Sequence, residues 1–212
     1  QDILQEAGAI MWSGSTGWKN GISRGSNASQ KLRCRLNTDA GQSMVSVPKL
    51  LIIAERGYCP DNMAWIERME ELRSLLSQFP WASLQIRNKH DLKDWQAVDK
   101  HLNRWLRQSE SETQILLNGK HFPEITCARH FPEVDMHTSN QYPSSLHGAS
   151  IHSHIALQTA EHLRFDYVQY GAIFPTSKPV QPVGLAALQS ISEASSLPVL
   201  AVGGISSLQK IS

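Results

Sequence analysis

The stretch FDYVQYGAIFPTSKP at residues 165–179, followed by PVGLAALQSIS at 182–192 and LPVLAVGGI at 197–205, decides the fold class. The first stretch is β-branched and aromatic before it turns polar, which predicts a strand that ends in a loop. In the second stretch, apolar residues recur at helical spacing. The third is apolar almost throughout, as parallel strands buried on both faces are. Together they predict a strand, a helix and a second, parallel strand.

The loop and the paired glycine of this unit are suited to an anion. Thr176 offers a hydroxyl group, Lys178 offers a cation, and Gly203 and Gly204 directly follow the second strand. Glycines at the carboxyl end of a parallel strand let backbone N–H groups approach a ligand closely, and the amino end of a following helix favours negative charge. A plain left-handed turn would also use these glycines, so a phosphate site and a structural turn both stay open.

The alternation of strands and helices extends back along the chain to Lys49. The further predicted strands are residues 50–57, 82–89, 113–120, 133–138 and 146–153, and the further predicted helices are 63–76, 95–106 and 155–163. Strict alternation predicts a parallel sheet covered by helices, either closed as a barrel or open and doubly wound. Seven strands can be recognised in all.

Residues 1–46 differ from the rest, because they are rich in Gly, Ser and Asn and show no sustained apolar period. We expect a linker or N-terminal extension there and one barrel domain over residues 47–212. No eighth strand is recognisable, so the first and seventh strands would have unpaired edges. The sequence leaves three explanations open. The N-terminal extension covers this gap, the sequence is a fragment of a longer polypeptide, or the barrel is incomplete.

Composition excludes several classes of protein. The 212 residues are 41% hydrophobic and 18% charged with a formal net charge of +1, which fits an ordinary globular domain and gives no basic excess for nucleic acid. No apolar run approaches the ~20 residues that span a bilayer, so no membrane contact and a cytoplasmic location are expected. The three cysteines are far apart and lack CxxC spacing, which favours neither disulfides nor zinc.

Five motifs together resemble the thiamine phosphate synthase/TenI family over roughly residues 49–212. They are LQIRNK at 84–89, LLNGK at 116–120, HGASIHS at 147–153, DYVQYGAIFPT at 166–176 and PVLAVGGI at 198–205. The resemblance implies a thiamine-biosynthesis protein whose α/β fold is a TIM (β/α)8-type barrel, here incomplete at its C-terminus. It also implies that the ligand is thiazole phosphate, which synthase members join to a pyrimidine pyrophosphate with Mg²⁺.

The resemblance also implies roles for individual residues. Arg87 and Lys89 match residues that contact the pyrophosphate, and Gln85 matches the glutamine on the pyrimidine side. Ser150, Thr176 and Lys178 match residues around the pyrophosphate. Gly203 and Gly204 match the residues that bind the thiazole phosphate.

Two departures from the synthase pattern concern the metal. Synthases carry an Asn-Asp pair after the third strand, where this chain has Asn118 and Gly119. They carry a GQxD motif after the fourth strand, and we place those positions at residues 139–142, where this chain reads SNQY. Both metal carboxylates are then missing. Because Mg²⁺ is usually held by one or two carboxylates together with substrate phosphates, we expect no protein metal site, and Mg²⁺ only if synthase activity is retained.

The Asn-Gly pair is instead typical of the TenI branch, which resembles thiazole tautomerases. That proton transfer needs a general acid/base rather than a metal. The histidine of the tautomerase pattern falls on Ala172, so we select His152, at the end of the fifth strand, as the catalytic candidate, with His137 as another and a structural role as the alternative. Asn118 is expected to contact substrate.

The sequence thus favours a tautomerase-like isomerase that binds a small phosphorylated heterocycle, thiazole phosphate or thiamine phosphate. A thiamine phosphate synthase, which is a transferase, and a non-catalytic phosphate-binding or regulatory module are the alternatives. Homo-oligomers, or fusion behind a domain such as a Nudix hydrolase, are compatible with this prediction.

Overall fold

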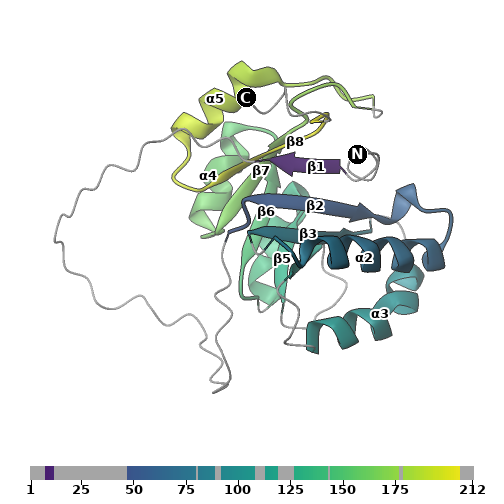
Figure 1. Cartoon of the computed structure of the whole chain (residues 1–212). Helices are drawn as coiled ribbons and strands as arrows, with labels where there is room; N and C mark the ends of the chain where they lie inside the picture. The colour runs from purple at the N-terminus through teal and green to yellow at the C-terminus, as the bar shows by residue number, and fades with distance from the viewer. Residues whose placement is uncertain are drawn as a thin grey trace.

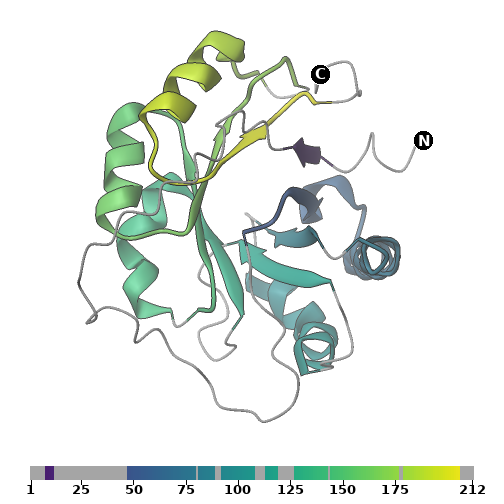
Figure 2. The same cartoon turned by 60° about the vertical axis from the view of Figure 1, so that its left-hand side comes forward.

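The computed structural model describes residues 8–11, 47–79, 81–88, 92–107, 113–118, 127–142, 144–176 and 179–205. Its strands form a closed ring in chain order, with helices on the outside (Figures 1 and 2). The strands are β1 (Gly8–Met11), β2 (Leu50–Glu55), β3 (Ala82–Arg87), β4 (Gln114–Asn118), β5 (Ala128–Phe131), β6 (His147–Ile151), β7 (Tyr167–Gly171) and β8 (Val199–Val202). The helices are η1 (Arg56–Tyr58), α2 (Asn62–Leu76), α3 (Leu92–Arg107), η2 (Glu133–Gln141), α4 (His154–His162) and α5 (Gly184–Ala194).

Strands β2 to β8 are the seven parallel strands of an α/β, TIM-barrel-like fold, as expected. The ring is completed by β1, which pairs antiparallel with β2 from Gly8 to Met11 and, through Met11, with Ala201 of β8. This strand lies within the segment expected to be a linker or extension. It covers the backbone edges of β2 and β8, which would otherwise have no partner. The run GAIM is too short to stand out by periodicity in a Gly- and Ser-rich segment.

One predicted strand is wrong. Residues 133–138 belong to η2, a 3₁₀ helix, and the fourth parallel strand is β5, which precedes it and pairs with β4 and β6. The sequence of β5 is ARHF, and its Arg129 and His130 are fully buried. Two ionisable residues in a four-residue strand give no apolar signal, whereas EVDMHT alternates as a half-buried strand would.

Side chains on the two faces of the strands form separate cores. Inside the ring, Leu51, Leu116, Tyr167 and Leu200 pack together. Outside it, one apolar cluster joins α2 and α3 to β2–β4, and another joins α4 and α5 to β6–β8. Because both faces are buried, the strands contain the near-continuous apolar runs on which the prediction of a parallel sheet rested.

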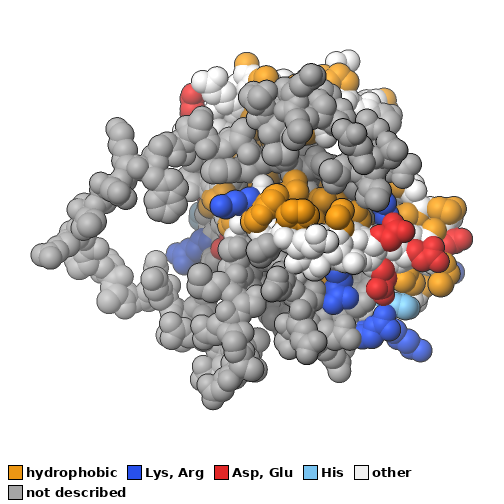
Figure 3. Space-filling model, in the orientation of Figure 1, with side chains coloured by type: hydrophobic (Ala, Val, Ile, Leu, Met, Phe, Trp, Pro, Cys, Tyr) orange, Lys and Arg blue, Asp and Glu red, His pale blue; other side chains and the backbone are white. Residues whose placement is uncertain are grey.

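The outer sides of α2 and α3 are charged, as Figure 3 shows at the right of that view. Glu70 of α2 and Arg104 of α3 form an ion pair at 3.2 Å. This pair is largely exposed, so it adds little to stability. None of the helices described is both long and apolar enough to cross a bilayer.

Candidate functional site

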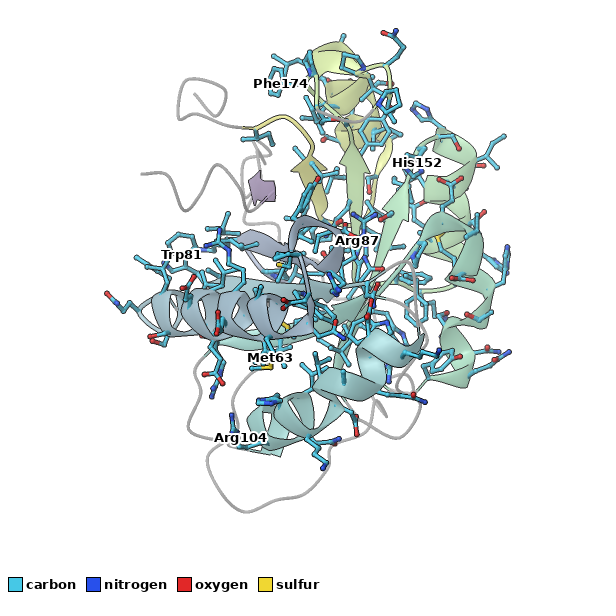
Figure 4. The ribbon with its side chains drawn as sticks, turned by 90° about the vertical axis from the view of Figure 1, so that its right-hand side faces the viewer. Met63, Trp81, Arg87, Arg104, His152 and Phe174 are labelled. Atoms are coloured by element: carbon cyan, nitrogen blue, oxygen red, sulfur yellow. The ribbon has the colours of Figure 1, made fainter. Side chains whose placement is uncertain are left out.

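The carboxyl ends of the parallel strands gather polar side chains at one end of the ring. Glu55, Arg87, Asn118, His130 and Ser150 come from β2 to β6, and the register places Glu55 beside Arg87, Arg87 beside Asn118, and Asn118 beside His130. In Figure 1 the β2 arrow points to the right, and Figure 4 brings that side forward, with Arg87 among the strand ends and His152 and Phe174 nearer the edge. Barrel enzymes place their active sites at this end.

Arg87, predicted to contact pyrophosphate, is paired with a carboxylate that the sequence did not identify. Its Nη1 donates to Oε2 of Glu55 at 2.6 Å, and the two side chains are 22% and 7% exposed. The Nε of Arg87 is buried and has no hydrogen-bond partner among the described residues. Glu55 is the last residue of the apolar strand β2. A single acidic residue at the end of such a strand is the sequence signal that could have predicted Glu55 as a site residue.

Deeper in the ring, two glutamines meet across it. Gln169 Nε2 on β7 donates to Gln85 Oε1 on β3 at 2.8 Å, and both side chains are almost completely buried. The Nε2 of Gln85 has no hydrogen-bond partner within the described part of the chain. Gln85, the predicted pyrimidine contact, is therefore held by a residue that sequence reasoning missed.

His130 is the centre of a buried polar chain. Its Nδ1 lies 3.0 Å from the Tyr167 hydroxyl and its Nε2 lies 2.9 Å from Ser150 Oγ. Burial, with a smaller effect of the Arg87 charge, lowers the pKa of His130 to about 3, so the imidazole is neutral near pH 7. Burial also raises the pKa of Tyr167, which keeps its hydroxyl protonated. The hydrogen-bonded series Tyr167–His130–Ser150 can hold or relay a proton, but His130 is a weak base.

Gly148 makes this chain geometrically feasible. It lies on β6 between His130 and Tyr167 in the register, and a Cβ at this position would meet the Tyr167 ring well inside 3.0 Å. The glycine lets the ring cross β6 and reach His130. His130 was not predicted as a site residue because β5 gives no apolar signal in the sequence.

His152, the predicted catalytic residue, lies at the rim just past β6. Its side chain is 64% exposed, and its Nδ1 lies 2.7 Å from Oε2 of Glu133, the first residue of η2. Ser153 caps α4 by accepting from the Ala156 N–H, which fixes the backbone next to His152. A histidine oriented by a carboxylate through one nitrogen can exchange protons through the other. His137, the other candidate, is exposed on η2.

The predicted phosphate residues lie at the ends of β7 and β8. Gly203 and Gly204 adopt positive φ of 93° and 69°, where the loop after β7 packs against them, and Phe174 N donates to Gly203 O at 3.0 Å. A Cβ on Gly204 would lie 2.6 Å from the Phe174 carbonyl oxygen. The loop that carries Thr176 thus explains both glycines, and a phosphate contact there stays a prediction. Lys89, Gly119 and Lys178 lie outside the described residues.

The correct position of β5 changes one family assignment. The four residues that follow this strand are Pro132, Glu133, Val134 and Asp135, not residues 139–142, which end η2 or follow it. The placement of the GQxD positions at 139–142 is therefore wrong, and Asp135 supplies a carboxylate at the last of them. Glu133 is engaged by His152, and no group of three His, Cys, Asp or Glu side chains converges among the described residues.

A comparison with known proteins assigns the family. The family model described as thiamine monophosphate synthase (TMP-TENI) matches residues 51–210. The chain belongs to this thiamine-biosynthesis family. A relative from Aquifex aeolicus (strain VF5) that carries the name of a second thiamine-phosphate synthase is 28% identical over 168 residues, 76% of this chain and 87% of that protein.

Two further proteins are similar to it. The thiamine-phosphate synthase of Koribacter versatilis (strain Ellin345) is 29% identical over 134 residues, 58% of this chain and 62% of that protein. The solved thiamine phosphate pyrophosphorylase from Pyrococcus furiosus has a TM-score of 0.50 and 24% identity, over 64% of this chain and 68% of that one. This last likeness supports the barrel-like fold alone.

Proposed function

We propose that this thiamine monophosphate synthase family member binds thiazole phosphate, or a closely related phosphorylated heterocycle, and transfers a proton on it as thiazole tautomerases do. The His152–Glu133 pair at the rim carries this proposal. A carboxylate on Nδ1 leaves Nε2 to take a proton from one ring atom and return it to another. The product is an isomer, so no leaving group and no metal are needed.

The remaining predicted residues bind the ligand. Thr176, Lys178, Gly203 and Gly204 are proposed for the phosphate, because hydroxyl, ammonium and backbone N–H groups all favour an anion. The heterocycle would lie over Asn118 and Ser150, with Gln85 and Lys89 as further contacts. His130 stays neutral below it and keeps Ser150 in place by the 2.9 Å hydrogen bond.

The test is conversion of the non-aromatic thiazole phosphate tautomer to the aromatic one, followed by absorbance, with Mg²⁺ absent. We expect His152→Asn to lower kcat by roughly 10²-fold or more and Glu133→Gln to lower it by about tenfold, since general acid–base groups contribute on the order of 10²–10⁴-fold. His154→Asn is the matched control, because this neighbouring exposed histidine contacts Ser190 instead. Full turnover in His152→Asn would eliminate the proposed proton shuttle.

A synthase is the second candidate, and Asp135 after β5 favours it together with the names of the relatives. Formation of thiamine phosphate from thiazole phosphate and pyrimidine pyrophosphate with Mg²⁺ would support it, with Asp135→Asn expected to remove the activity. Gly119→Asp should then raise the rate by restoring the second carboxylate of the family pattern. Binding of the ligand without either activity would support the third hypothesis, that the protein is a non-catalytic phosphate-binding or regulatory module.

A further inference from the structure

The carboxyl ends of the parallel strands, with Glu55, Arg87, Asn118, His130 and Ser150, form the end of the ring that we call the mouth. The ion pair between Glu55 and Arg87 sets the charge on the β2–β3 side of this mouth. The two residues are register neighbours at the ends of β2 and β3, and their 2.6 Å contact joins a nearly buried carboxylate to a guanidinium that is only 22% exposed. A buried carboxylate at this distance largely cancels the charge of its partner. Arg87 therefore presents hydrogen-bond donors to the mouth, and Glu55 offsets its positive charge on the β2 side.

No other described cation compensates Glu55. Arg56, the next residue, donates its Nε to Asn62 at 2.7 Å, lies 3.5 Å from Asp94, and donates its Nη1 to the Cys59 carbonyl at 2.6 Å. It is thus held at the start of α2. The other charged groups described at this end of the strands include Glu133 and Asp135 of η2 and Lys93 and Asp94 at the start of α3. An anion with several charges placed at Arg87 would meet the Glu55 carboxylate at short range in a poorly solvated environment.

The same position also holds buried hydrogen-bond donors. The Nε of Arg87 and the Nε2 of Gln85 are buried donors without a partner among the described residues. Acceptor atoms of a neutral ring would satisfy such donors without adding negative charge beside Glu55. The Glu55 charge and the unsatisfied donors therefore both favour a neutral ring over a charged group at this position.

We infer that Glu55 is a specificity-determining residue that excludes pyrophosphate from the Arg87 end of the mouth, so that the ligand is a phosphate monoester whose uncharged ring lies at this end. The inference rests on the proposed function for the location of the single phosphate at the β7–β8 end. It adds a reason, independent of the metal carboxylates, why pyrimidine pyrophosphate is a poor ligand.

Calorimetric titration with inorganic pyrophosphate and with thiazole phosphate, both without Mg²⁺, tests it. Glu55→Gln should bind pyrophosphate at least tenfold more tightly than the wild type, with thiazole phosphate affinity changed by less than about twofold. Glu55→Asp keeps the charge and should behave as the wild type does. The double variant Glu55→Gln/Arg87→Met should lose the gain, which assigns it to Arg87.

An unchanged pyrophosphate affinity in Glu55→Gln, or a gain that persists without Arg87, overturns the inference. Should Glu55→Gln fail to fold, the wild type alone decides. It is expected to bind pyrophosphate no more tightly than inorganic phosphate, and a tenfold preference for pyrophosphate would refute the role of Glu55. Failure of the wild type to bind thiazole phosphate would instead count against the proposed function, because the role of Glu55 is measured on pyrophosphate.

Discussion

Replacing Gly148 by alanine tests whether the buried chain through His130 depends on one missing methyl group. The added Cβ would overlap the Tyr167 ring, which is fully buried and cannot move outward without disturbing the interior of the ring of strands. Overpacking of this kind costs about 1–3 kcal/mol. Displacing the ring also breaks the 3.0 Å hydrogen bond to His130 Nδ1. A buried polar atom that loses its partner costs a further ~1–3 kcal/mol.

The expected loss in the free energy of unfolding is therefore about 2–6 kcal/mol, a large part of the roughly 5–15 kcal/mol typical of a domain. Urea denaturation followed by circular dichroism measures it. Gly57→Ala is the matched control, because a Cβ there would have the Glu55 side chain at 3.9 Å as its nearest neighbour. We expect that control to stay within about 0.5 kcal/mol of the wild type.

Tyr167→Phe separates the two contributions, since it removes the hydroxyl and keeps the ring. In the Gly148→Ala background it should cost much less than it does alone, because the hydrogen bond is already lost. Equal costs in both backgrounds, or a Gly148→Ala variant as stable as Gly57→Ala, would refute the idea that Gly148 makes room for the chain.

Two further predictions concern stability. Burial lowers the pKa of His130 from its ordinary 6.5 to about 3, so as the pH falls below 6.5 the unfolded chain binds a proton that the native protein does not. Stability therefore decreases as the pH is lowered, by up to ~1.4 kcal/mol per pH unit and by about 1.7 kcal/mol between pH 6.5 and 5. Urea denaturation at both pH values should show that His130→Gln lacks this contribution, whereas the exposed His137→Gln keeps it, and equal slopes in the two variants would contradict the assignment. Gly204→Ala should lower the free energy of unfolding by at least ~1 kcal/mol more than Gly184→Ala. Both positions have positive φ, but a Cβ on Gly184 meets nothing within 4 Å whereas one on Gly204 meets the Phe174 carbonyl, so equal losses would show that backbone strain alone matters.

Local patterns predicted most of the fold. The apolar strands β2, β3, β4, β6, β7 and β8 and the four α-helices were recognised because hydrophobic periodicity is a property of neighbouring residues. Prediction failed at β5, where buried Arg129 and His130 conceal a strand, and at β1, which is too short to carry a period. Missing β5 also displaced the GQxD assignment and concealed Asp135.

The candidate site was predicted as a set of residues but not as a set of contacts. Gln85, Arg87, Asn118 and Ser150 were selected from motifs, and the register brings Arg87 and Asn118 together. The residues that hold them, Glu55, Gln169, His130 and Tyr167, were missed. His152 was selected by its place after a strand, and its carboxylate partner Glu133 was not.

The sequence by itself determined the alternation of strands and helices, the family and the end of the barrel where ligand residues gather. Only the tertiary structure decided which polar groups meet there. The pairs Arg87–Glu55, Gln169–Gln85 and His130–Tyr167 are separated by 32, 84 and 37 positions in the chain. No periodicity links residues that far apart. Parallel pairing brings the ends of β2 and β3 together, the curvature of the sheet brings the inner faces of β5 and β7 together across β6, and closure of the ring brings β3 and β7 face to face.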